Sequence, residues 1–433
     1  MSAHLPAARV ILSTLLAWVV YSGPASAEPL REALDRMLQS HKRLAAAEAD
    51  VRASDAGALK ARGGYFPDLK LTANKGRQHV HKPAPSQSTD MINRDATISL
   101  TQNLIDFGKT DAEVDKADLA NTQSRTTLAS VRQDLVLEGI SSHINLLRAY
   151  RSLAFAEQSV ENIRRQTGLE ESRVELGAGM PTDVLQAKSQ LAGAQARLVR
   201  ARGSLVAAIN RYRAVFASEP PPSKEVTTVP VPDGLLPKSL DDAVEMARDK
   251  NYQLRAARLT GQIAQAEVRR VVGAELAPKL NAVAESKVKI NVDGTPGNQQ
   301  EQVVKLELSY PFNLGLAPVR SLAVAREGVL AADNRHADTR DVVEEQVRNA
   351  WQALATAREN ADYLHNQARI SAEFLSMARE ERLHGRRSLI DVLAGETTLI
   401  NAQSDAASAE ADVGIAAFTL LKSVGVLNET LID

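Results

Sequence analysis

The chain has 433 residues, and its 52 lysines and arginines nearly balance its 53 aspartates and glutamates. This balance leaves no basic excess of the kind that nucleic-acid binding requires, so we expect no nucleic acid among its partners. The absence of cysteine excludes disulfide bonds and a lipid anchor on a cysteine. Aromatic residues make up 4% of the sequence, which suits long helices better than a bulky globular core.

The first 27 residues have the pattern of a signal peptide. Arg9 precedes the apolar run 10–20, and Ala25-Ser26-Ala27 is a small-x-small cleavage site. The apolar run is about eleven residues, too short for a helix to cross a bilayer core of roughly 30 Å. The alternative interpretation is a buried N-terminal helix. No later apolar stretch is long enough for a membrane helix, so a position in a membrane would require a β-barrel.

The remaining chain contains an internal duplication with an offset of about 208 to 211 residues. Leu30-x-x-Ala33 matches Leu240-x-x-Ala243, and Asp183-Val184-Leu185 matches Asp391-Val392-Leu393. Between the copies lies a segment with six prolines, which indicates a linker. The predicted units are a signal peptide (1–27), a first structural repeat (28–217), a Pro-rich linker (218–237), a second structural repeat (238–425) and a C-terminal tail (426–433).

Each repeat has the same predicted order of elements. The first repeat contains a helix at about 29–61, strands at about 67–76 and 94–104, and a helical hairpin at about 109–217. The second contains a helix at about 238–272, strands at about 279–292 and 302–312, and a helical hairpin at about 318–424. The longest helices would reach on the order of 100 Å at about 1.5 Å per residue. Such helices need partners along their whole length, as in a coiled coil or a helical barrel.

The strand segments alternate apolar and polar residues. Leu69, Leu71 and Ala73 alternate with polar residues, and between 280 and 292 the apolar positions alternate with charged ones. Alternation over about ten residues is typical of transmembrane β-barrels, although a half-buried soluble hairpin also shows it. The segments 77–91 and 293–300 are rich in turn-forming residues and are expected to be exposed loops.

Four strands cannot close a barrel, and an open sheet edge is not tolerated in hydrocarbon. Several chains must therefore share one barrel. Two chains would give eight strands with a filled interior, whereas three give twelve strands around a lumen. The charged faces of the strands favour a wet lumen, so we predict a homotrimer in contact with membrane lipid.

Local motifs in these positions resemble the TolC family of outer-membrane efflux and secretion channels. The strand-to-helix entries are Leu100-Thr-Gln-Asn-Leu-Ile-Asp-Phe-Gly108, where Asn103 replaces the family's proline, and Tyr310-Pro-Phe-Asn-Leu-Gly315. The hairpin turns are Leu176-Gly-Ala-Gly-Met-Pro-Thr-Asp-Val-Leu185 and His384-Gly-Arg-Arg-Ser-Leu-Ile-Asp-Val-Leu393. The resemblance covers essentially the whole chain after residue 27.

This resemblance implies a mainly helical protein with a membrane β-barrel in contact with outer-membrane lipid. The fold expected from it is a trimeric twelve-stranded barrel continued by a periplasmic α-helical barrel. The expected function is the exit duct of a tripartite export system, with a periplasmic adaptor protein and an inner-membrane transporter of the ABC type as partners. Type I protein secretion is favoured because no cysteine is available for a lipid anchor. The alternatives are a drug or small-molecule efflux duct and a periplasmic coiled-coil protein that crosses no membrane.

The resemblance also implies a gate at the hairpin turns. Asp183 and Arg387 resemble the family's gating pair, and Asp391 resembles the outer of two constricting carboxylate rings. Ala394 stands where the second ring would have an aspartate, and Arg382 stands where a gate tyrosine would be, so Arg382 is a candidate for a different link.

A simpler interpretation of the same turns is available. Asp183 and Asp391 could be helix N-caps, which aspartate favours. Gly177, Gly179 and Gly385 are the turn glycines, and two of them, Gly177 and Gly385, are expected to have positive φ.

No other motif points to chemistry. Asp106-Phe-Gly-Lys-Thr110 contains a Gly-Lys-Thr, but Asn103 stands where a phosphate loop needs glycine. His79 and His81 have no neighbouring third and fourth ligand, so a solvated loop pair is favoured over a metal site. We therefore predict neither catalytic residues nor cofactors nor a metal site.

Overall fold

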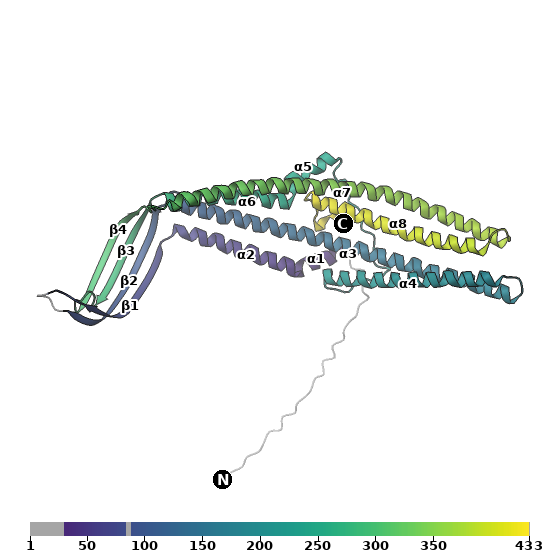
Figure 1. Cartoon of the computed structure of the whole chain (residues 1–433), viewed down its shortest axis with the longest axis horizontal. Coiled ribbons are helices and arrows are strands. Elements are labelled where there is room, and N and C mark those ends of the chain that lie inside the picture. The colour runs from purple at the N-terminus through teal and green to yellow at the C-terminus, as the bar shows by residue number, and fades with distance from the viewer. Residues whose placement is uncertain (1–29, 84–87, 433) are drawn as a thin grey trace, which may run out of the picture.

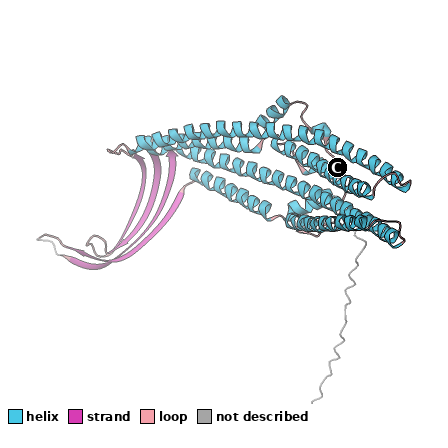
Figure 2. Ribbon diagram, turned by 45° about the vertical axis from the view of Figure 1, so that its right-hand side comes forward, coloured by secondary structure: helices cyan, strands magenta, loops and turns pink. Residues whose placement is uncertain are grey.

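The computed structural model describes residues 30–83 and 88–432, so the predicted signal peptide lies outside the described residues. The protein is an elongated arm with a four-stranded sheet at one end and long helices running away from it (Figure 1). Figure 2 shows that the sheet is curved and that the helices leave it from one end. None of the helices in the described ranges combines the length and the apolar composition that a membrane span needs.

The two halves of the chain have the same order of elements. The first half contains α1 (Leu30–Ser40), α2 (Lys42–Arg62), β1 (Asp68–Val80), β2 (Thr89–Ile105), α3 (Lys109–Glu175) and α4 (Pro181–Phe216). The second contains α5 (Leu240–Lys250), α6 (Tyr252–Val271), β3 (Lys279–Ile290), β4 (Asn298–Ser309), α7 (Ala317–Leu383) and α8 (Leu389–Ser423). Of these, α3 and α7 have 67 residues each, and each forms an antiparallel hairpin with the shorter helix that follows it.

The first helix of each half, predicted as continuous, is divided in two. His41 and Asn251 adopt extended backbone angles and act as N-caps of α2 and α6. The ring nitrogen Nδ1 of His41 accepts a hydrogen bond from the Arg43 amide at 3.2 Å, and Asn251 Oδ1 accepts one from the Gln253 amide at 2.9 Å. An N-cap side chain satisfies amides that have no partner within the helix, so it stabilises the new helix start.

The strands of the first half are longer than predicted. They extend through Val80 and from Thr89, so much of the expected loop 77–91 is sheet. Arg77 explains part of the extension, because its Nε and Nη2 atoms donate to the Asp90 carboxylate at 2.9 and 2.7 Å across the hairpin. Such a cross-strand pair of opposite charges stabilises an antiparallel hairpin.

In the second half, β4 is displaced from its predicted bounds, and β3 begins as predicted but ends two residues early. The strand predicted at 302–312 begins at Asn298 and ends at Ser309, two residues before Pro311, which has no amide hydrogen to donate to a ladder. The strand predicted at 279–292 ends at Ile290, because Asn291 has a φ of 55° and begins a turn. In that turn Asn291 Oδ1 accepts a hydrogen bond from the Gly297 amide at 2.9 Å.

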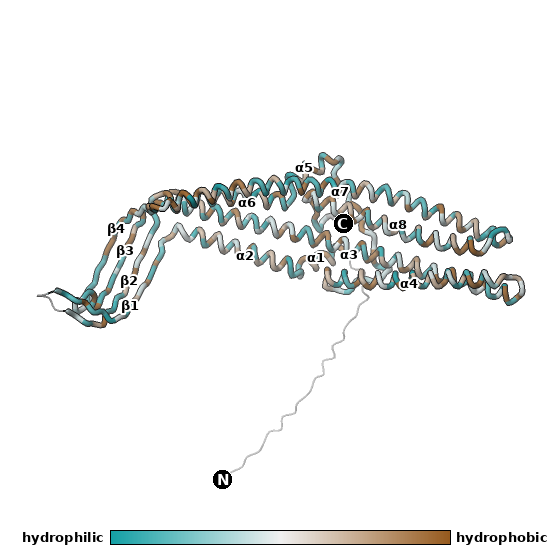
Figure 3. Tube along the Cα trace, viewed as in Figure 1, coloured by the Kyte–Doolittle hydropathy of each residue, from teal (hydrophilic) through white to brown (hydrophobic). Residues whose placement is uncertain are grey.

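The sheet is antiparallel with the order β1-β2-β3-β4, and the β2–β3 pairing joins the two halves. Residues directly opposite each other in the register share a face. One face, called the apolar face, carries Leu69, Leu71, Ala73, Ala96, Ile98, Leu100, Ala284, Val304, Leu306 and Leu308. The other, called the polar face, carries Lys70, Thr72, Asn74, Thr97, Ser99, Glu285, Lys287 and Lys305. Hydrophobic and hydrophilic residues accordingly alternate along each strand (Figure 3).

The helices pack around several small cores spaced along the arm. The largest core lies where α1, α3, α4 and α8 meet, and it includes Leu34, Leu135 and Phe418. A second core joins α5, α7 and α8 around Val347 and Leu420. Part of the predicted tail, 426–433, packs on the first core, since Leu427 is buried and its carbonyl oxygen accepts a hydrogen bond from Gln133 at 3.1 Å. The cores hold the middle of the arm together and leave the sheet and the hairpin tips at opposite ends.

Candidate functional site at the hairpin tips

The two hairpin turns lie together at the end of the arm farthest from the sheet (Figure 1). Each turn contains a glycine with positive φ, 81° at Gly177 and 69° at Gly385, which other residues adopt only with strain. In each turn an amide reaches back to the preceding helix: Ala178 donates to the Arg173 carbonyl at 2.9 Å and Arg386 to the Glu381 carbonyl at 2.8 Å. The two halves therefore present the following helices, α4 and α8, through similar turns.

Gly179 is required in the first turn for a different structural reason. A Cβ atom at this position would approach Val174 Cγ2 to 2.9 Å and the Val174 backbone nitrogen to 3.0 Å. Neither distance leaves room for a side chain, so the first turn can close tightly onto α3 only with glycine here.

The two turn aspartates occupy equivalent positions in the first turn of their helices. Asp183 is the third residue of α4 and Asp391 the third of α8, while the N-cap positions are held by Met180 and Ser388. Ser388 Oγ accepts a hydrogen bond from the Asp391 amide at 3.2 Å. The interpretation of these aspartates as N-caps is therefore wrong. Their carboxylates remain near positive helix ends, and the Asp391 side chain is exposed.

Arg387 contacts its own hairpin. Its Nε lies 2.6 Å from Glu381 Oε2, and its guanidinium carbon lies 5.3 Å from the centre of the Phe374 ring. Within the described residues of one protomer Arg387 forms no ion pair with Asp183, so the predicted pair is not made inside a single chain.

Arg382, which the sequence singled out as a departure from the family, connects the two hairpins. Its Nη2 lies 2.7 Å from Oε1 of Glu170, a residue of α3 whose side chain is only 4% exposed. Arg173 contacts the same oxygen at 3.1 Å, and Arg382 Nη1 also donates to the Arg387 carbonyl oxygen at 3.3 Å. A nearly buried carboxylate therefore joins α3 to α7 close to the tips.

A second buried carboxylate, Glu396 of α8, connects three helices. Its side chain is 1% exposed and is contacted by the guanidinium of Arg379 on α7. The amide of Asn162 on α3 donates to its other oxygen at 3.1 Å. We call the group Arg379, Glu396 and Asn162 the buried triad. A charge with this little exposure is stable only when it is paired and hydrogen-bonded.

Sequence reasoning did not identify the buried triad, although one signal was present. Glu396 stands in the apolar stripe of α8, among Leu389, Leu393 and Ile400 at helical spacing. A carboxylate in such a stripe indicates a buried partner. Glu170 gave no such signal, because it stands among exposed charged residues of α3 and its partner Arg382 lies 212 positions away in the chain.

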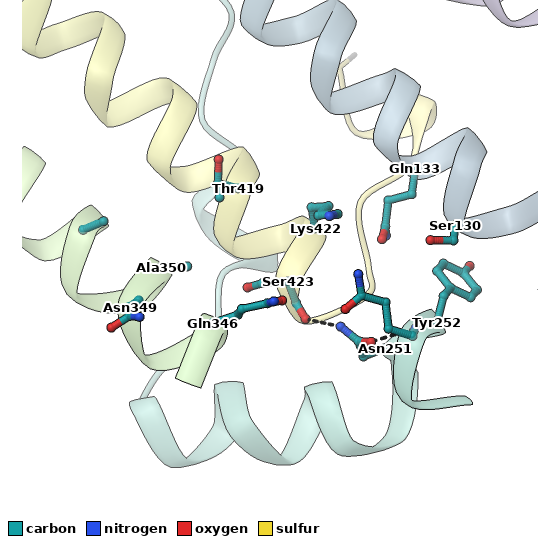
Figure 4. Close-up of a pocket in the computed structure, with 12 residues that line it drawn as sticks. Ser130, Gln133, Asn251, Tyr252, Gln346, Asn349, Ala350, Thr419, Lys422 and Ser423 are labelled. Carbon is teal, nitrogen blue, oxygen red and sulfur yellow. Dashed lines mark hydrogen bonds between the residues drawn. The ribbon is translucent and has the colours of Figure 1, made fainter. Parts of the chain in front are cut away.

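A polar cavity of about 490 Å³ lies in the middle of the arm, where α3, α6, α7 and α8 approach one another (Figure 4). Two of its amide side chains already form hydrogen bonds within the protein. Asn251 donates to the Ser423 carbonyl oxygen at 2.8 Å, and Gln133 donates to the Leu427 carbonyl oxygen. The cavity therefore has a structural polar lining and no cluster of charged groups. Across residues 30–83 and 88–432, no three histidine, aspartate or glutamate side chains are grouped as a metal site would need.

Comparison with known proteins agrees with this architecture. The model of the family described as "Outer membrane efflux protein" matches the chain twice, over residues 33–217 and 243–426. The chain is 25% identical to the outer membrane efflux protein BepC of Brucella suis, over 96% of this chain and 90% of BepC. It is 24% identical to the outer membrane protein TolC of Escherichia coli, over 94% of this chain and 84% of TolC.

A secretion protein and a solved crystal structure are also similar to this chain. The chain is 26% identical to the alkaline protease secretion protein AprF of Pseudomonas aeruginosa, over 85% of this chain and 78% of AprF. The crystal structure of the outer membrane protein VceC of Vibrio cholerae has the same fold, with a TM-score of 0.77 over 92% of this chain and 96% of VceC, at 17% identity. The chain belongs to the outer membrane efflux protein family and lies in the outer membrane with its helices extending into the periplasm.

Proposed function

We propose that three copies of this chain form the exit duct of a tripartite export system and that the duct acts passively, without catalysis. The observation that carries this proposal is the sheet. It has an apolar face and a polar face over all four strands, and β1 and β4 each leave one edge unpaired. Each backbone N–H or C=O group without a hydrogen-bond partner costs about 4–8 kcal/mol when it is transferred from water to an alkane, so an unpaired strand edge is strongly unfavourable in hydrocarbon. Three sheets joined edge to edge remove every open edge and enclose the polar faces around a lumen.

The first expected result is therefore a trimer. Protein extracted from the membrane in mild detergent should have three times the mass of one chain by native mass spectrometry or light scattering. Three four-stranded sheets give a twelve-stranded barrel with room for water, whereas two give a barrel that its own side chains fill. A stable monomer or dimer under these conditions would contradict the proposed duct.

The hairpin tips are proposed as its periplasmic gate. Asp183, Arg387 and Asp391 lie at the same end of the molecule, and the first two form no pair within one protomer. A threefold axis would place the tip of α4 in one protomer beside the tip of α7 in the next. We infer that Asp183 and Arg387 pair between neighbouring protomers in the closed state and that three copies of Asp391 make a ring that concentrates cations.

The proposed pair can be tested by crosslinking, because the chain has no cysteine of its own. The double variant Asp183→Cys with Arg387→Cys should form disulfides between protomers under mild oxidation and migrate as covalent dimers and trimers on denaturing gels. Asp183→Cys combined with Arg369→Cys is the control, because Arg369 lies within α7, farther from the tip than Arg387, which is in the turn after that helix. If the first variant assembles into trimers but crosslinks no better than the control, the two side chains do not pair.

The tips also offer a surface for a periplasmic adaptor protein. Leu176, Met180 and Leu185 on the first hairpin and Leu383 on the second are exposed, with Leu176 at 83%. A cluster of exposed apolar side chains at one end of a protein typically marks a contact with another protein. We propose that an adaptor covers this surface and that an inner-membrane pump, of the ABC type, completes the system.

For the cargo, we propose secreted protein, as in type I secretion. Similarity to a protein named for protease secretion and the absence of a cysteine for a lipid anchor support this proposal. Small-molecule efflux is the second candidate, supported by the family description and by BepC.

Deletion of the gene in its own host should separate the two candidates. We expect the deletion strain to lose one or more proteins from its culture medium while its susceptibility to detergents and antibiotics changes little. Reintroducing the gene should restore those proteins to the medium. An unchanged medium together with increased drug susceptibility would favour the efflux duct instead.

A further inference from the structure

We propose that Lys75 of β1 and Arg94 of β2 form a binding site for the phosphate groups of lipids in the outer leaflet of the outer membrane. The two residues are called the basic pair. This inference rests on the proposed barrel, because it requires the apolar face of the sheet to face lipid.

The basic pair lies on the apolar face. Lys75 and Arg94 are directly opposite each other in the β1–β2 register. Along β1 the apolar face continues from Leu71 and Ala73 to Lys75, and along β2 it continues from Ile98 and Ala96 to Arg94, always at alternate positions. Because side chains two residues apart point to the same side of a strand, both cations project toward lipid and not into the lumen. Both are exposed.

The charge of the basic pair is unbalanced within the protomer. In the described part of the chain, neither residue forms an ion pair. Arg77, next on the same face of β1, is already bound by Asp90, whose oxygens lie 2.7 and 2.9 Å from its nitrogens. Asp95, adjacent to Arg94 in sequence, is on the polar face and accepts from Asn74 at 2.9 Å.

Two like charges directly opposite each other destabilise a hairpin. Placing them there is favourable only if an anion outside the chain neutralises them. Ammonium and guanidinium groups both form strong charge-assisted hydrogen bonds with phosphate. The basic pair therefore has the chemistry of a phosphate site.

The level of the basic pair matches the outer lipid headgroups. The helices leave the opposite end of the strands and extend into the periplasm, so the β1–β2 tip points away from the cell (Figure 1). On the neighbouring β3, Leu280 lies on the apolar face at the helical end, and Ile290, directly opposite Arg94, lies ten positions farther along that strand. Ten residues span about 33 Å at about 3.3 Å each, or about 25 Å of membrane thickness at a tilt near 40°. This equals the height of the apolar band of such barrels, about 25 Å. Arg94 thus lies at the outer edge of the band, where the phosphates of outer-leaflet lipids begin.

The experiment compares three ligands on the detergent-solubilised full-length protein. The first probe is lipid A, which is a glucosamine lipid that carries two phosphates. The second is the same lipid after enzymatic removal of both phosphates. The third is inorganic phosphate at equal phosphate concentration. Binding is measured by native mass spectrometry and by the ligand-dependent rise in melting temperature. The same spectra report the oligomeric state, so failure of the proposed trimer is seen separately from failure of this site.

The test variant is Lys75→Gln with Arg94→Gln, and the matched control is Lys70→Gln with Lys279→Gln. The control removes the same charge from the same sheet, but Lys70 and Lys279 are on the polar face. Each basic side chain near an anionic lipid surface contributes roughly fivefold in affinity, so the test variant should bind lipid A about 25-fold more weakly than the wild type. The control should bind like the wild type, and dephosphorylated lipid should bind the wild type as weakly as lipid A binds the test variant.

Three outcomes would overturn the proposal. The test variant could bind lipid A as tightly as the wild type, or dephosphorylated lipid could bind the wild type as tightly as lipid A does. Alternatively, inorganic phosphate could raise the melting temperature as much as lipid A, which would make the site one for free phosphate. If the test variant fails to assemble, Lys75→Gln alone and Arg94→Gln alone are measured, each with an expected loss of about fivefold.

Discussion

Replacing Arg379 with methionine should raise the open fraction of the channel and lower its melting temperature. The substitution leaves the carboxylate of Glu396, which is 1% exposed, with Asn162 as its remaining partner. Removing one partner of a buried ion pair typically costs about 3–5 kcal/mol. The cost here should be at the lower end, because the Arg379 side chain itself is 46% exposed. Since the buried triad joins α8 to α3 near the tips, part of this loss should weaken the closed arrangement of the hairpins.

Single-channel recording in planar bilayers and thermal unfolding followed by circular dichroism measure the two effects. Arg369→Met is the matched control, since it makes the same substitution on the same helix in an ion pair that is more than half exposed on both sides. Such a pair contributes little. Adding Glu396→Leu to Arg379→Met should restore most of the melting temperature, because no unpaired buried charge remains. If Arg379→Met behaves like the control in both measurements, the buried triad does not hold the hairpins together.

Arginine at Leu306 should sharply reduce the amount of assembled protein in the outer membrane. Leu306 lies on the apolar face of β4 and is 69% exposed in one protomer, as expected of a lipid-facing side chain. An arginine on the lipid face of a barrel costs about 2–4 kcal/mol near the midplane of the bilayer. Three copies per trimer multiply this cost. Heat-modifiable migration of outer-membrane fractions on gels measures the assembled fraction.

Arginine at Ser309, three positions along the same strand, is the control. Ser309 pairs with Lys279 in the register and belongs to the polar face, so the new charge would project into the lumen. Water and ions in the lumen would screen its repulsion with Lys279, which hydrocarbon cannot do for a charge at Leu306. We expect near wild-type assembly for this variant. Asn291, which falls within the strand predicted at 279–292, is unsuitable as a second control, because it lies in the turn after β3. Equal assembly of the Leu306 and Ser309 variants would show that the two faces are assigned wrongly.

Sequence patterns predicted the long elements well and their ends less well. The helical hairpins begin and end within a residue or two of their predicted bounds, since a long run of helical periodicity leaves little choice. The missed breaks at His41 and Asn251 depend on single capping contacts, which a periodic pattern does not reveal. The extension of β1 and β2 depends on cross-strand partners such as Arg77 and Asp90, which become visible only once the register is known.

The residues of the proposed gate were likewise predicted only in part. Arg382 could be singled out from the sequence because it stands at a recognisable place in the turn motif, but its partner could not. Glu170 lies in the middle of a helical surface rich in charged residues, and nothing in its neighbourhood distinguishes it from the solvent-exposed glutamates around it. Its near-complete burial follows from the packing of α3 against the second hairpin. The expected contact of Asp183 with Arg387 does not form within one chain, so it remains a prediction about neighbouring protomers.

Local periodicity and duplication in the sequence were sufficient to predict two similar halves, each with a pair of alternating strands and a very long helical hairpin. Those features are encoded within a few tens of residues, where spacing alone selects helix or strand. Which charged side chains are buried and which are exposed depends on the tertiary structure. Glu396 becomes a paired, buried anion because three helices converge on it. Lys75 and Arg94, which form no ion pair with any described residue, become neighbours because the β1–β2 register sets them opposite each other. Burial and register depend on contacts between distant parts of the chain, so they emerge only when those parts are packed together.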